Sequence, residues 1–467
     1  MGSRQRQLGG SSGGPVRFRT TFRNTIHDLF RGKGWVETES ETEWDVAWVD
    51  KDWIRENFMT LSPGFADHQR INHFPNHFEL TKKDNLIKNL KRTQRSLLRE
   101  GMHEEAAKYD FFPGTYVLPA DYGLFVEEFK NHPSGTIWIM KPTGSAQGKG
   151  IFLFTKLSAI NEWKKDHTWK NAEDAKAAAA YVVQRYIENP QLIGGKKFDL
   201  RLYVLVTSYS PLTVYMYRNG FARFSSYRYN TNAKNLGDTF VHLTNVAVQK
   251  TGPGFDAGAG SKWLLRNYRL FLVGKYGHQA TDKMFADVEE LVINTLLSVQ
   301  KVMISDKHCF EMYGYDILVD DQLKPWLIEV NASPSISADT IQDYDLKLGL
   351  LEDVYTIVDV ESKFQPSGAN EGSSGNTGAK DAKGNLETTV GGYDLIYHGG
   401  PVKPDKLATY TSRLGCFDEK ERERSLKKLY AKHGMKWKPA RVDRIGAEKA
   451  DKHADKHADK HEQSATA

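Results

Sequence analysis

The chain of 467 residues contains only two cysteines, Cys309 and Cys416. So few thiols argue against a disulfide framework or a cysteine zinc site, and they predict a reducing compartment. The sequence also lacks a run of eighteen apolar residues, and its start, MGSRQRQLGG, lacks the apolar core of a secretory signal. We therefore expect neither a membrane span nor export. Arg6 stands where a myristoylation motif needs Ser or Thr, so we expect no lipid anchor.

An excess of charge of one sign is missing as well, because 64 basic residues face 59 acidic ones, a net charge of +5. The segment Leu80 to Arg99 is the exception, with seven basic residues against one acidic residue, a net +6. Its apolar residues keep a helical spacing, which predicts a helix with a positive outer face. That face suits an acidic partner, or it is simply solvated. A nucleic acid is not expected, since the segment has no interleaved aromatics and the chain has no nucleic-acid motif.

The chain divides by composition into a Gly/Ser-rich arm, a long globular part and a tail. Between Thr136 and Val330, short apolar runs alternate with glycine-rich loops and with helical stretches at Lys262 to Tyr276 and Asp282 to Met303. This mixture predicts an α+β enzyme with a large sheet. The expected parts are a flexible arm (1–15), an N-terminal, substrate-facing part (16–135), a catalytic part (136–360), a disordered linker (361–392), and short ordered segments with a charged tail (393–467).

The strongest local signal is the segment from Tyr315 to Asn331, which reads YDILVDDQLKPWLIEVN. Two extended runs flank a loop of about four residues, so the segment predicts a hairpin with Asp316 opposite Glu329. The strand period of two then places Asn331 on the same face as Glu329. Two carboxylates and an amide oxygen are ligands that Mg²⁺ prefers. The alternative is an ordinary hairpin with solvated acids.

A second signal is Lys141 at the end of an apolar run, followed by the loop from Gly144 to Gly150. A lysine and a glycine loop suit a lid over phosphates, although a simple hairpin turn has the same pattern. The loop is not a Walker A motif, because the glycines are wrongly spaced and Gly150 replaces the metal-binding Ser or Thr. The protein-kinase motifs are absent too.

A third signal is a charged stripe in GGKKFDLR, where Lys197, Asp199 and Arg201 share one face of a strand. The stripe is either a set of cross-strand charge pairs or a phosphate-binding group with an orienting carboxylate. Arg223 and the cluster His242-Leu243-Thr244-Asn245 add polar groups beside other apolar runs. His242 is either a general base or a packed histidine.

Together these segments resemble the tubulin tyrosine ligase-like family, whose members are ATP-dependent amino acid ligases with an ATP-grasp fold. The resemblance covers about Val16 to Val360. Its motifs are NHFPNHFELTKKDNLIKNLKR, KPTGSAQGKGIFLF, QRYIENPQLIGGKKFDLRLYVLV, FVHLTNVAVQK and KHCFEMYGYDILVDDQLKPWLIEVNASPS. It implies N-terminal, central and C-terminal subdomains followed by a disordered tail.

The resemblance also implies roles for particular residues. The expected nucleotide site consists of Lys141, Gln147, Gly148, Gln184, Arg185, Tyr186, Ile187, Lys197, Asp199, Thr244 and Asn245. Asp316, Glu329 and Asn331 are the expected Mg²⁺ ligands, and Glu329 is also expected in catalysis. Arg201 and Arg223 would orient carboxylate and phosphoryl oxygens, with Lys347 and Arg223 binding the incoming glutamate.

The implied reaction is polyglutamylation of the acidic tubulin tail on microtubules, through an acylphosphate that free L-glutamate attacks. No side-chain nucleophile is needed, which agrees with a site of Lys, Arg and metal ligands. Cilia or flagella are the expected location, and accessory subunits are possible partners. A glycylase of the same family and an inert microtubule-binding protein remain alternatives. In the tail, His453, His457 and His461 bind metal or are solvated.

Overall fold

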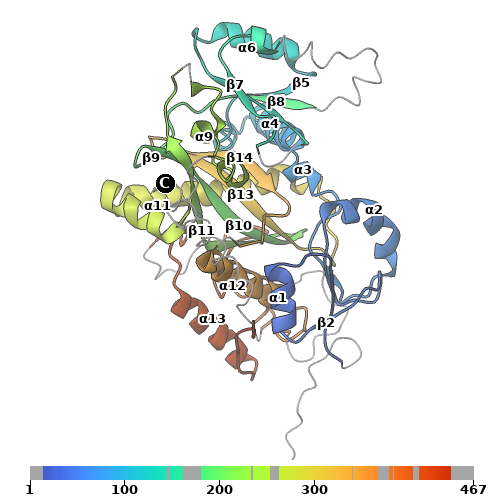
Figure 1. Cartoon of the computed structure of the whole chain (residues 1–467). Helices are drawn as coiled ribbons and strands as arrows, with labels where there is room; N and C mark the ends of the chain where they lie inside the picture. Colours follow the sequence, from blue (N-terminus) through green and yellow to red (C-terminus); the bar gives the residue numbers. More distant parts are fainter. Residues whose placement is uncertain are drawn as a thin grey trace, which may run out of the picture.

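The computed structural model describes residues 14–144, 148–160, 180–232, 235–252, 262–338, 340–365, 378–381, 383–402 and 410–442. At its centre is an eight-stranded sheet with the order β14-β13-β10-β11-β16-β15, in which β9 also pairs with β10 and β12 with β11 (Figure 1). The strands are β9 (Leu192–Ile193), β10 (Lys196–Tyr209), β11 (Leu212–Arg228), β12 (Lys262–Leu264), β13 (Glu311–Val319), β14 (Pro325–Asn331), β15 (Thr389–Val390) and β16 (Tyr393–His398). Mixed helices and sheets confirm the α+β expectation.

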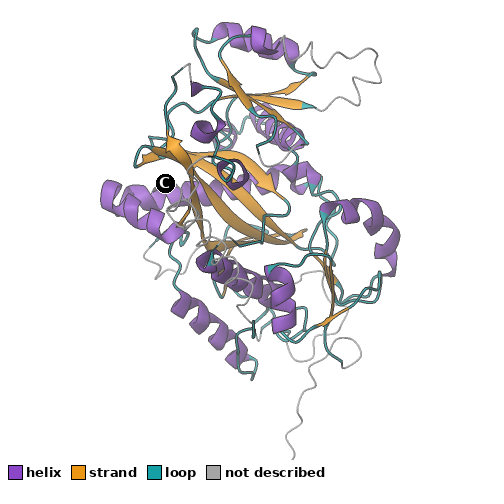
Figure 2. Cartoon of the chain, in the orientation of Figure 1, coloured by secondary structure: helices purple, strands orange, loops and turns teal. Residues whose placement is uncertain are grey.

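Helices cover both faces of the central sheet (Figure 2). Leu200 and Leu202 of β10 lie in one core cluster with residues of α11 (Leu265–Gln300). Tyr203 and Leu205 lie in a second cluster with residues of α12 (Ile341–Val358). Because successive side chains of a strand point to opposite faces, burial on both sides gives the nearly continuous apolar run seen in the sequence.

The long helix α11 bends at Gly277, whose φ of 81° is a left-handed conformation that favours glycine. Two helices were expected here, and the second corresponds to the part of α11 after this bend. The first was placed too early, because Lys262–Leu264 forms strand β12 and pairs with Phe221 to Arg223 of β11. The pairing of these three residues with β11 at the sheet edge thus outweighs the helical spacing of their own sequence.

The N-terminal part forms a parallel sheet with the order β2-β1-β3-β4, at the lower right of Figure 1. Asn24 caps α1, since its side chain accepts a hydrogen bond from the Ile26 N–H. The elements are β1 (Arg17–Thr20), α1 (Thr25–Gly32), β2 (Val36–Glu37), β3 (Val46–Trp48), α2 (Lys51–Leu61), the 3₁₀ turn Ser62–Gly64, and β4 (Arg70–Ile71).

The basic segment forms two helices rather than one. Lys82 has an extended backbone (φ −86°, ψ 127°), which separates α3 (Phe78–Thr81) from α4 (Lys83–Arg99). The correction matters because it makes Lys83 the first residue of α4. Lys88, Arg92, Arg95 and Arg99 are exposed at spacings of four, three and four residues, so they share one face of the helix. The short helix α5 (His103–Ala107) follows.

A small sheet with the order β5-β8-β6-β7 lies at the top of Figure 1, beside α6 (Tyr122–Asn131). Its strands are β5 (Thr115–Leu118), β6 (Trp138–Pro142), β7 (Phe152–Phe154) and β8 (Tyr181–Arg185). Phe125 of α6 packs edge-on against Trp138 of β6, with ring centroids 5.2 Å apart. The other face of the small sheet contributes Ile139 to a cluster with Leu243, near the short helices α9 (Thr239–His242) and α10 (Val246–Gln249).

The described residues beyond position 377 pack against the central sheet, which corrects the expected disordered linker in part. Ala379 is buried and its N–H donates to the carbonyl of Ile357. Strand β16 pairs with β11, and α13 (Glu419–Lys432) docks on α12 through Arg422, which contacts Asp353 at 2.9 Å. The sequence here is rich in small residues, which was interpreted as disorder. Small residues can also pack in the narrow space between closely packed elements. Residues 443–467 lie outside the described part.

Cys309 is buried, Cys416 is partly buried, and both are free thiols. Among the described residues, no helix combines the length and apolarity that crossing a bilayer requires.

Candidate active site

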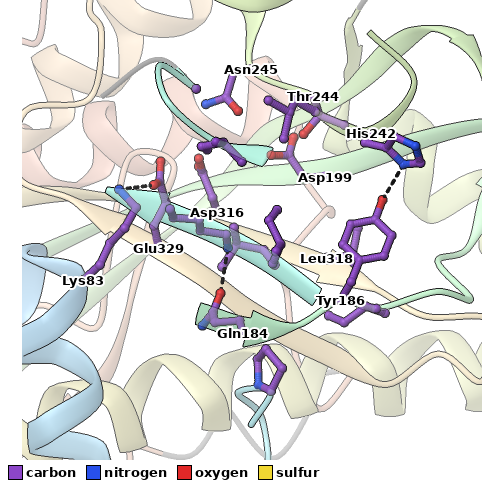
Figure 3. Close-up of a pocket in the computed structure, with 18 of the residues that line it drawn as sticks. Lys83, Gln184, Tyr186, Asp199, His242, Thr244, Asn245, Asp316, Leu318 and Glu329 are labelled. Atoms are coloured by element: carbon purple, nitrogen blue, oxygen red, sulfur yellow. Dashed lines mark hydrogen bonds and ion pairs between the residues drawn. The ribbon is translucent and has the colours of Figure 1, made fainter. Parts of the chain in front are cut away.

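A cleft lies where the small sheet meets the central sheet, and most of the residues expected to bind nucleotide line it (Figure 3). The small sheet and the segment after it supply Lys141, Gln184, Arg185, Tyr186 and Ile187. The central sheet supplies Lys197, Asp199, Asp316 and Glu329, and the loops add Gly148, Thr244 and Asn245. Gln147 lies outside the described residues. Segments far apart in the sequence thus meet in one cleft.

Lys141 lies one residue before the end of strand β6, and its side chain is buried. Its Nζ donates to Gln184 Oε1 at 2.7 Å, and Gln184 Nε2 donates to Thr115 Oγ1 at 2.9 Å. Burial, together with the charge of Lys83, lowers the pKa of Lys141 to about 8. A partly desolvated ammonium with one neutral partner retains the capacity to bind an anion.

Lys197 on β10 lies near two aromatic rings, those of Tyr186 and Tyr229. Its Nζ donates to Tyr186 OH at 2.9 Å and to the His242 carbonyl at 3.0 Å, and it lies 4.5 Å from the Tyr186 ring centroid. Burial and the charge of Lys141 lower the pKa of Lys197 to about 7. Two buried lysines that repel each other form a site that becomes more favourable when an anion enters.

His242 is held at both ring nitrogens. Nδ1 lies 3.0 Å from Tyr186 OH, and Nε2 lies 3.1 Å from the Asn235 carbonyl. Since Tyr186 OH accepts from Lys197, it donates to Nδ1, and Nε2 carries the proton that reaches Asn235. Burial and Lys197 lower the pKa of His242. This arrangement favours the packed histidine over the general base.

Asp199, Arg223 and Asp316 form a buried charge network across three strands. Arg223 Nε donates to Asp199 Oδ1 at 2.8 Å, and its Nη2 contacts Asp199 Oδ2 and, at 2.8 Å, Asp316 Oδ2. Arg201 Nε donates to Asp316 Oδ1 at 2.6 Å. Burial opposes ionisation of Asp316, but the two guanidinium groups hold its pKa well below the ordinary value. The structure shows the cross-strand charge pairs of the first interpretation, and the phosphate-binding interpretation stays a prediction.

The hairpin β13-β14 has the expected register, with Asp316 opposite Glu329 and Gly314 opposite Asn331. Figure 3 shows the carboxyl groups of Asp316 and Glu329 pointing to the same side of the strands, toward Asn245. Asn331 Nδ2 lies 3.3 Å from Glu329 Oε1, so the three expected metal ligands are neighbours.

These residues fit a magnesium ion by their chemistry. The described residues contain no cluster of three or more His, Cys, Asp and Glu side chains that could hold a metal. Two carboxylates and an amide make an incomplete set of hard oxygen donors, which is the kind of site that Mg²⁺ shares with phosphate oxygens and water.

A larger cavity of about 1,020 Å³ adjoins the cleft and shares Glu329, Lys83 and Asn245 with it. Arg201, Arg223, Asn331 and Lys347 line this cavity. Its wall carries nine basic side chains against three carboxylates, so it suits a ligand with several negative charges. Lys347 lies on α12, and its Nζ lies 2.9 Å from Asp343 Oδ1.

Lys83 is a site residue that the sequence interpretation missed. Its Nζ lies 3.1 Å from Glu329 Oε2, and it lines both the cleft and the cavity. The basic segment was interpreted as a surface helix, and only the break at Lys82 turns the next lysine inward. The signal that could have identified Lys83 was its place as the first residue of helix α4, together with the acidic residue Glu329 on strand β14.

Comparison with known proteins places this geometry in a family. The model of the tubulin-tyrosine ligase family matches residues 60–367. The probable tubulin polyglutamylase TTLL9 of Bos taurus is 48% identical over 429 residues, which cover 86% of this chain and 88% of the bovine protein. The chain belongs to the tubulin-tyrosine ligase family. It is therefore an ATP-dependent ligase with an ATP-grasp-like fold.

Relatives with lower sequence identity are similar to this chain over nearly the same length. The probable tubulin polyglutamylase ttll-9 of Caenorhabditis elegans is 43% identical, with 85% of this chain and 88% of the worm protein covered. The probable alpha-tubulin polyglutamylase Ttll1 of Tetrahymena thermophila is 42% identical, with 82% of this chain and 92% of the ciliate protein covered. The similarity thus reaches beyond the matched family region into the parts that pack around it.

Proposed function

We propose that this ligase is a tubulin polyglutamylase, which adds glutamate to glutamate side chains of the acidic tubulin tail. The observation that carries the proposal is the continuity of two sites. A cleft with two buried lysines opens into a cavity where basic side chains outnumber acidic ones by nine to three. The names of the relatives, which are tubulin polyglutamylases, support this substrate.

In this proposal Lys141 and Lys197 bind the ATP phosphates, and the segment from Gln184 to Ile187 lines the adenine pocket. Gln147 and Gly148 belong to the covering loop, and Asp199, Thr244 and Asn245 complete the nucleotide site. The proposal rests on the lining of the cleft, where the apolar walls of Ile139, Leu243 and Leu318 lie beside the polar groups.

Asp316, Glu329 and Asn331 would hold Mg²⁺, which offsets phosphate charge when it is bound. Arg201 and Arg223 then orient the acceptor carboxylate and the transferred phosphoryl group, since both guanidinium groups face the cavity side of the sheet. Lys347 would bind a carboxylate of the incoming glutamate. The products of the first step are ADP and an acylphosphate, and the amine of glutamate converts the latter to an amide.

The exposed face of α4, defined by Lys88, Arg92, Arg95 and Arg99, is the proposed contact with the microtubule. Arg92, Arg95 and Arg99 have no ion pair with another described residue. Guanidinium groups along about two turns of helix attract an acidic surface, with a strength that falls as salt rises. An association with the cytoskeleton follows, and cilia or flagella are the proposed location, with accessory subunits as further partners.

The proposal extends to the organisation of the chain. Residues 16–135 would form the N-terminal, substrate-facing part, and residues 136–360 the central and C-terminal catalytic subdomains. The described residues between 378 and 442 add to that body through β16 and α13, and the charged end of the tail lies beyond them.

Incubation of the purified chain with microtubules, Mg-ATP and labelled glutamate or glycine tests the proposal. We expect label from glutamate to enter tubulin only with ATP. Label from glycine alone would identify a glycylase instead. If the isolated chain is inactive, addition of a ciliated-cell lysate supplies accessory subunits, and inactivity of the supplemented mixture would support an inert microtubule-binding protein.

A further inference from the structure

Behind the cavity wall lies a chain of three polar side chains that none of the roles above uses, and only its outer member, Ser333, lines the cavity. His73, which follows β4, has its Nδ1 2.8 Å from Oε1 of Glu311, the first residue of β13. On the other side of the ring, His73 Nε2 lies 3.3 Å from Ser333 Oγ. His73 and Glu311 are fully buried, whereas Ser333 is exposed and lines the cavity two residues after Asn331.

The contacts of Glu311 set the direction of these hydrogen bonds. Glu311 Oε2 accepts from the Phe74 N–H at 3.1 Å, and Oε1 faces His73 Nδ1. A carboxylate in this position accepts a hydrogen bond from the Nδ1–H, so in that tautomer of His73 the lone pair of Nε2 faces the Ser333 hydroxyl. The order of acid, imidazole and hydroxyl is that of a proton relay whose hydroxyl end faces the cavity.

The proposed reaction needs a proton acceptor in this cavity. An amino acid nitrogen that attacks an acylphosphate must lose a proton, and the nine lysine and arginine side chains of the wall cannot take it in their charged forms. Of the three carboxylates, Glu329 pairs with Lys83, Asp50 caps α2, and Asp52 pairs with Arg55.

Among the described residues, the imidazole that itself lines the cavity is that of His77. His77 has its Nδ1 3.1 Å from Thr81 Oγ1, and it forms no ion pair with a carboxylate of the described residues. The Ser333–His73–Glu311 chain is therefore the better-organised acceptor.

We propose that Ser333 accepts the proton of the attacking amine, with His73 and Glu311 as positioning residues behind it; the inference rests on the proposed function. As the new C–N bond forms, the C–O bond to phosphate breaks and phosphate leaves with the electron pair. The amine proton passes to Ser333 Oγ while the hydroxyl proton of Ser333 moves to His73 Nε2. Glu311 stabilises the resulting imidazolium, which then releases its proton to solvent.

The test compares two nucleophiles with microtubules and Mg-ATP. Hydroxylamine attacks acylphosphates as a neutral amine at neutral pH, so it needs the relay far less than glutamate does. For Ser333→Ala we expect incorporation of glutamate to fall about 100-fold, the usual contribution of one general base, with a much smaller fall in hydroxamate formation. Ser335→Ala is the matched control, because Ser335 lines the same wall and its variant should leave the ratio of the two rates unchanged.

Three outcomes would overturn the proposal. They are equal falls in both rates for Ser333→Ala, no fall in either rate, or the same change of ratio in Ser335→Ala. Glu311→Gln, which keeps the size of the side chain, should reproduce the selective loss, and Ser333→Ala decides the question if that variant does not fold. A wild-type chain that yields hydroxamate but no glutamyl product contradicts the proposed function rather than the formation of an acylphosphate, and it removes the basis of the relay as well.

Discussion

Lys83 at the start of α4 forms an ion pair with Glu329 of β14, with 3.1 Å between Nζ and Oε2 and side chains that are 17% and 19% exposed. The ammonium therefore lies where a divalent cation would approach Glu329. In Lys83→Met the carboxylate loses this partner, and a cation no longer displaces an ammonium. We expect MgCl₂ without nucleotide to raise the melting temperature of Lys83→Met more than that of the wild type, as measured by calorimetry.

Lys88→Met is the control for the Lys83 experiment, since Lys88 lies on the same helix but pairs with Asp84 at 3.7 Å on its outer side. Its response to magnesium should equal that of the wild type. An equal response in Lys83→Met would show that the ion pair does not compete with the metal.

ATP binding should be coupled to proton uptake. Burial and the charge of Lys83 lower the pKa of Lys141 to about 8, and burial and the charge of Lys141 lower that of Lys197 to about 7. Phosphate oxygens favour the charged ammonium and raise both pKa values, so near pH 8 the complex holds more protons than the free protein. Affinity for ATP should therefore fall as pH rises above 8. Calorimetric titrations in buffers of different ionisation enthalpy measure this uptake.

Lys141→Met provides the comparison for proton uptake, because it removes one of the two titrating groups and the repulsion that it exerts on the other. The number of protons taken up should decrease in this variant. Release of protons by the wild type on binding ATP would refute the assignment of these lysines to the phosphates.

Arg223 stabilises two buried carboxylates at once, Asp199 and Asp316. Arg223→Ala leaves both without this guanidinium, and breaking a buried pair costs about 3–5 kcal/mol. We expect a loss of that size in the free energy of unfolding, measured with urea. Arg228→Ala, an exposed position on the same strand, should change the free energy by no more than about 0.5 kcal/mol. A loss for Arg223→Ala as small as that of the control would mean that water or Arg201 replaces the pair.

Much of this site followed from local patterns in the sequence. The register of the β13-β14 hairpin depends on two short runs and one loop, and Asp316 lies opposite Glu329 as expected. The shared face of Lys197, Asp199 and Arg201 follows from the strand period alone. Patterns of this kind are fixed by neighbours within about twenty residues, which is why they can be read from one chain.

Contacts between distant segments could not be predicted in this way. The ion pair of Lys83 with Glu329 depends on a break at Lys82 and on how α3 packs beside β14, and neither leaves a periodic signal. The docking of α13 depends on Arg422 meeting Asp353 across 69 residues of sequence. For the same reason the region after Pro366 was interpreted as linker and tail, although its described parts complete the central sheet.

The exposed face of α4 should control microtubule binding rather than chemistry. Arg92→Glu/Arg95→Glu reverses two charges of this face, so we expect weaker co-sedimentation with microtubules and a shallower dependence on salt. Arg424→Glu/Lys428→Glu makes the same change in charge on exposed positions of α13, which lies below the central sheet in Figure 1, whereas α4 lies above it. Equal losses in both double variants would attribute binding to net charge instead of to α4.

The most direct test of the central claim is mass spectrometry of tubulin tails after incubation with Mg-ATP and L-glutamate, using the wild type and Glu329→Gln. Glutamine keeps the size of the side chain but removes the charge of a proposed metal ligand. The account predicts glutamate chains on the tail with the wild type, none with Glu329→Gln, and nearly equal co-sedimentation of the two proteins with microtubules. Glutamate addition by Glu329→Gln at the wild-type rate would contradict it.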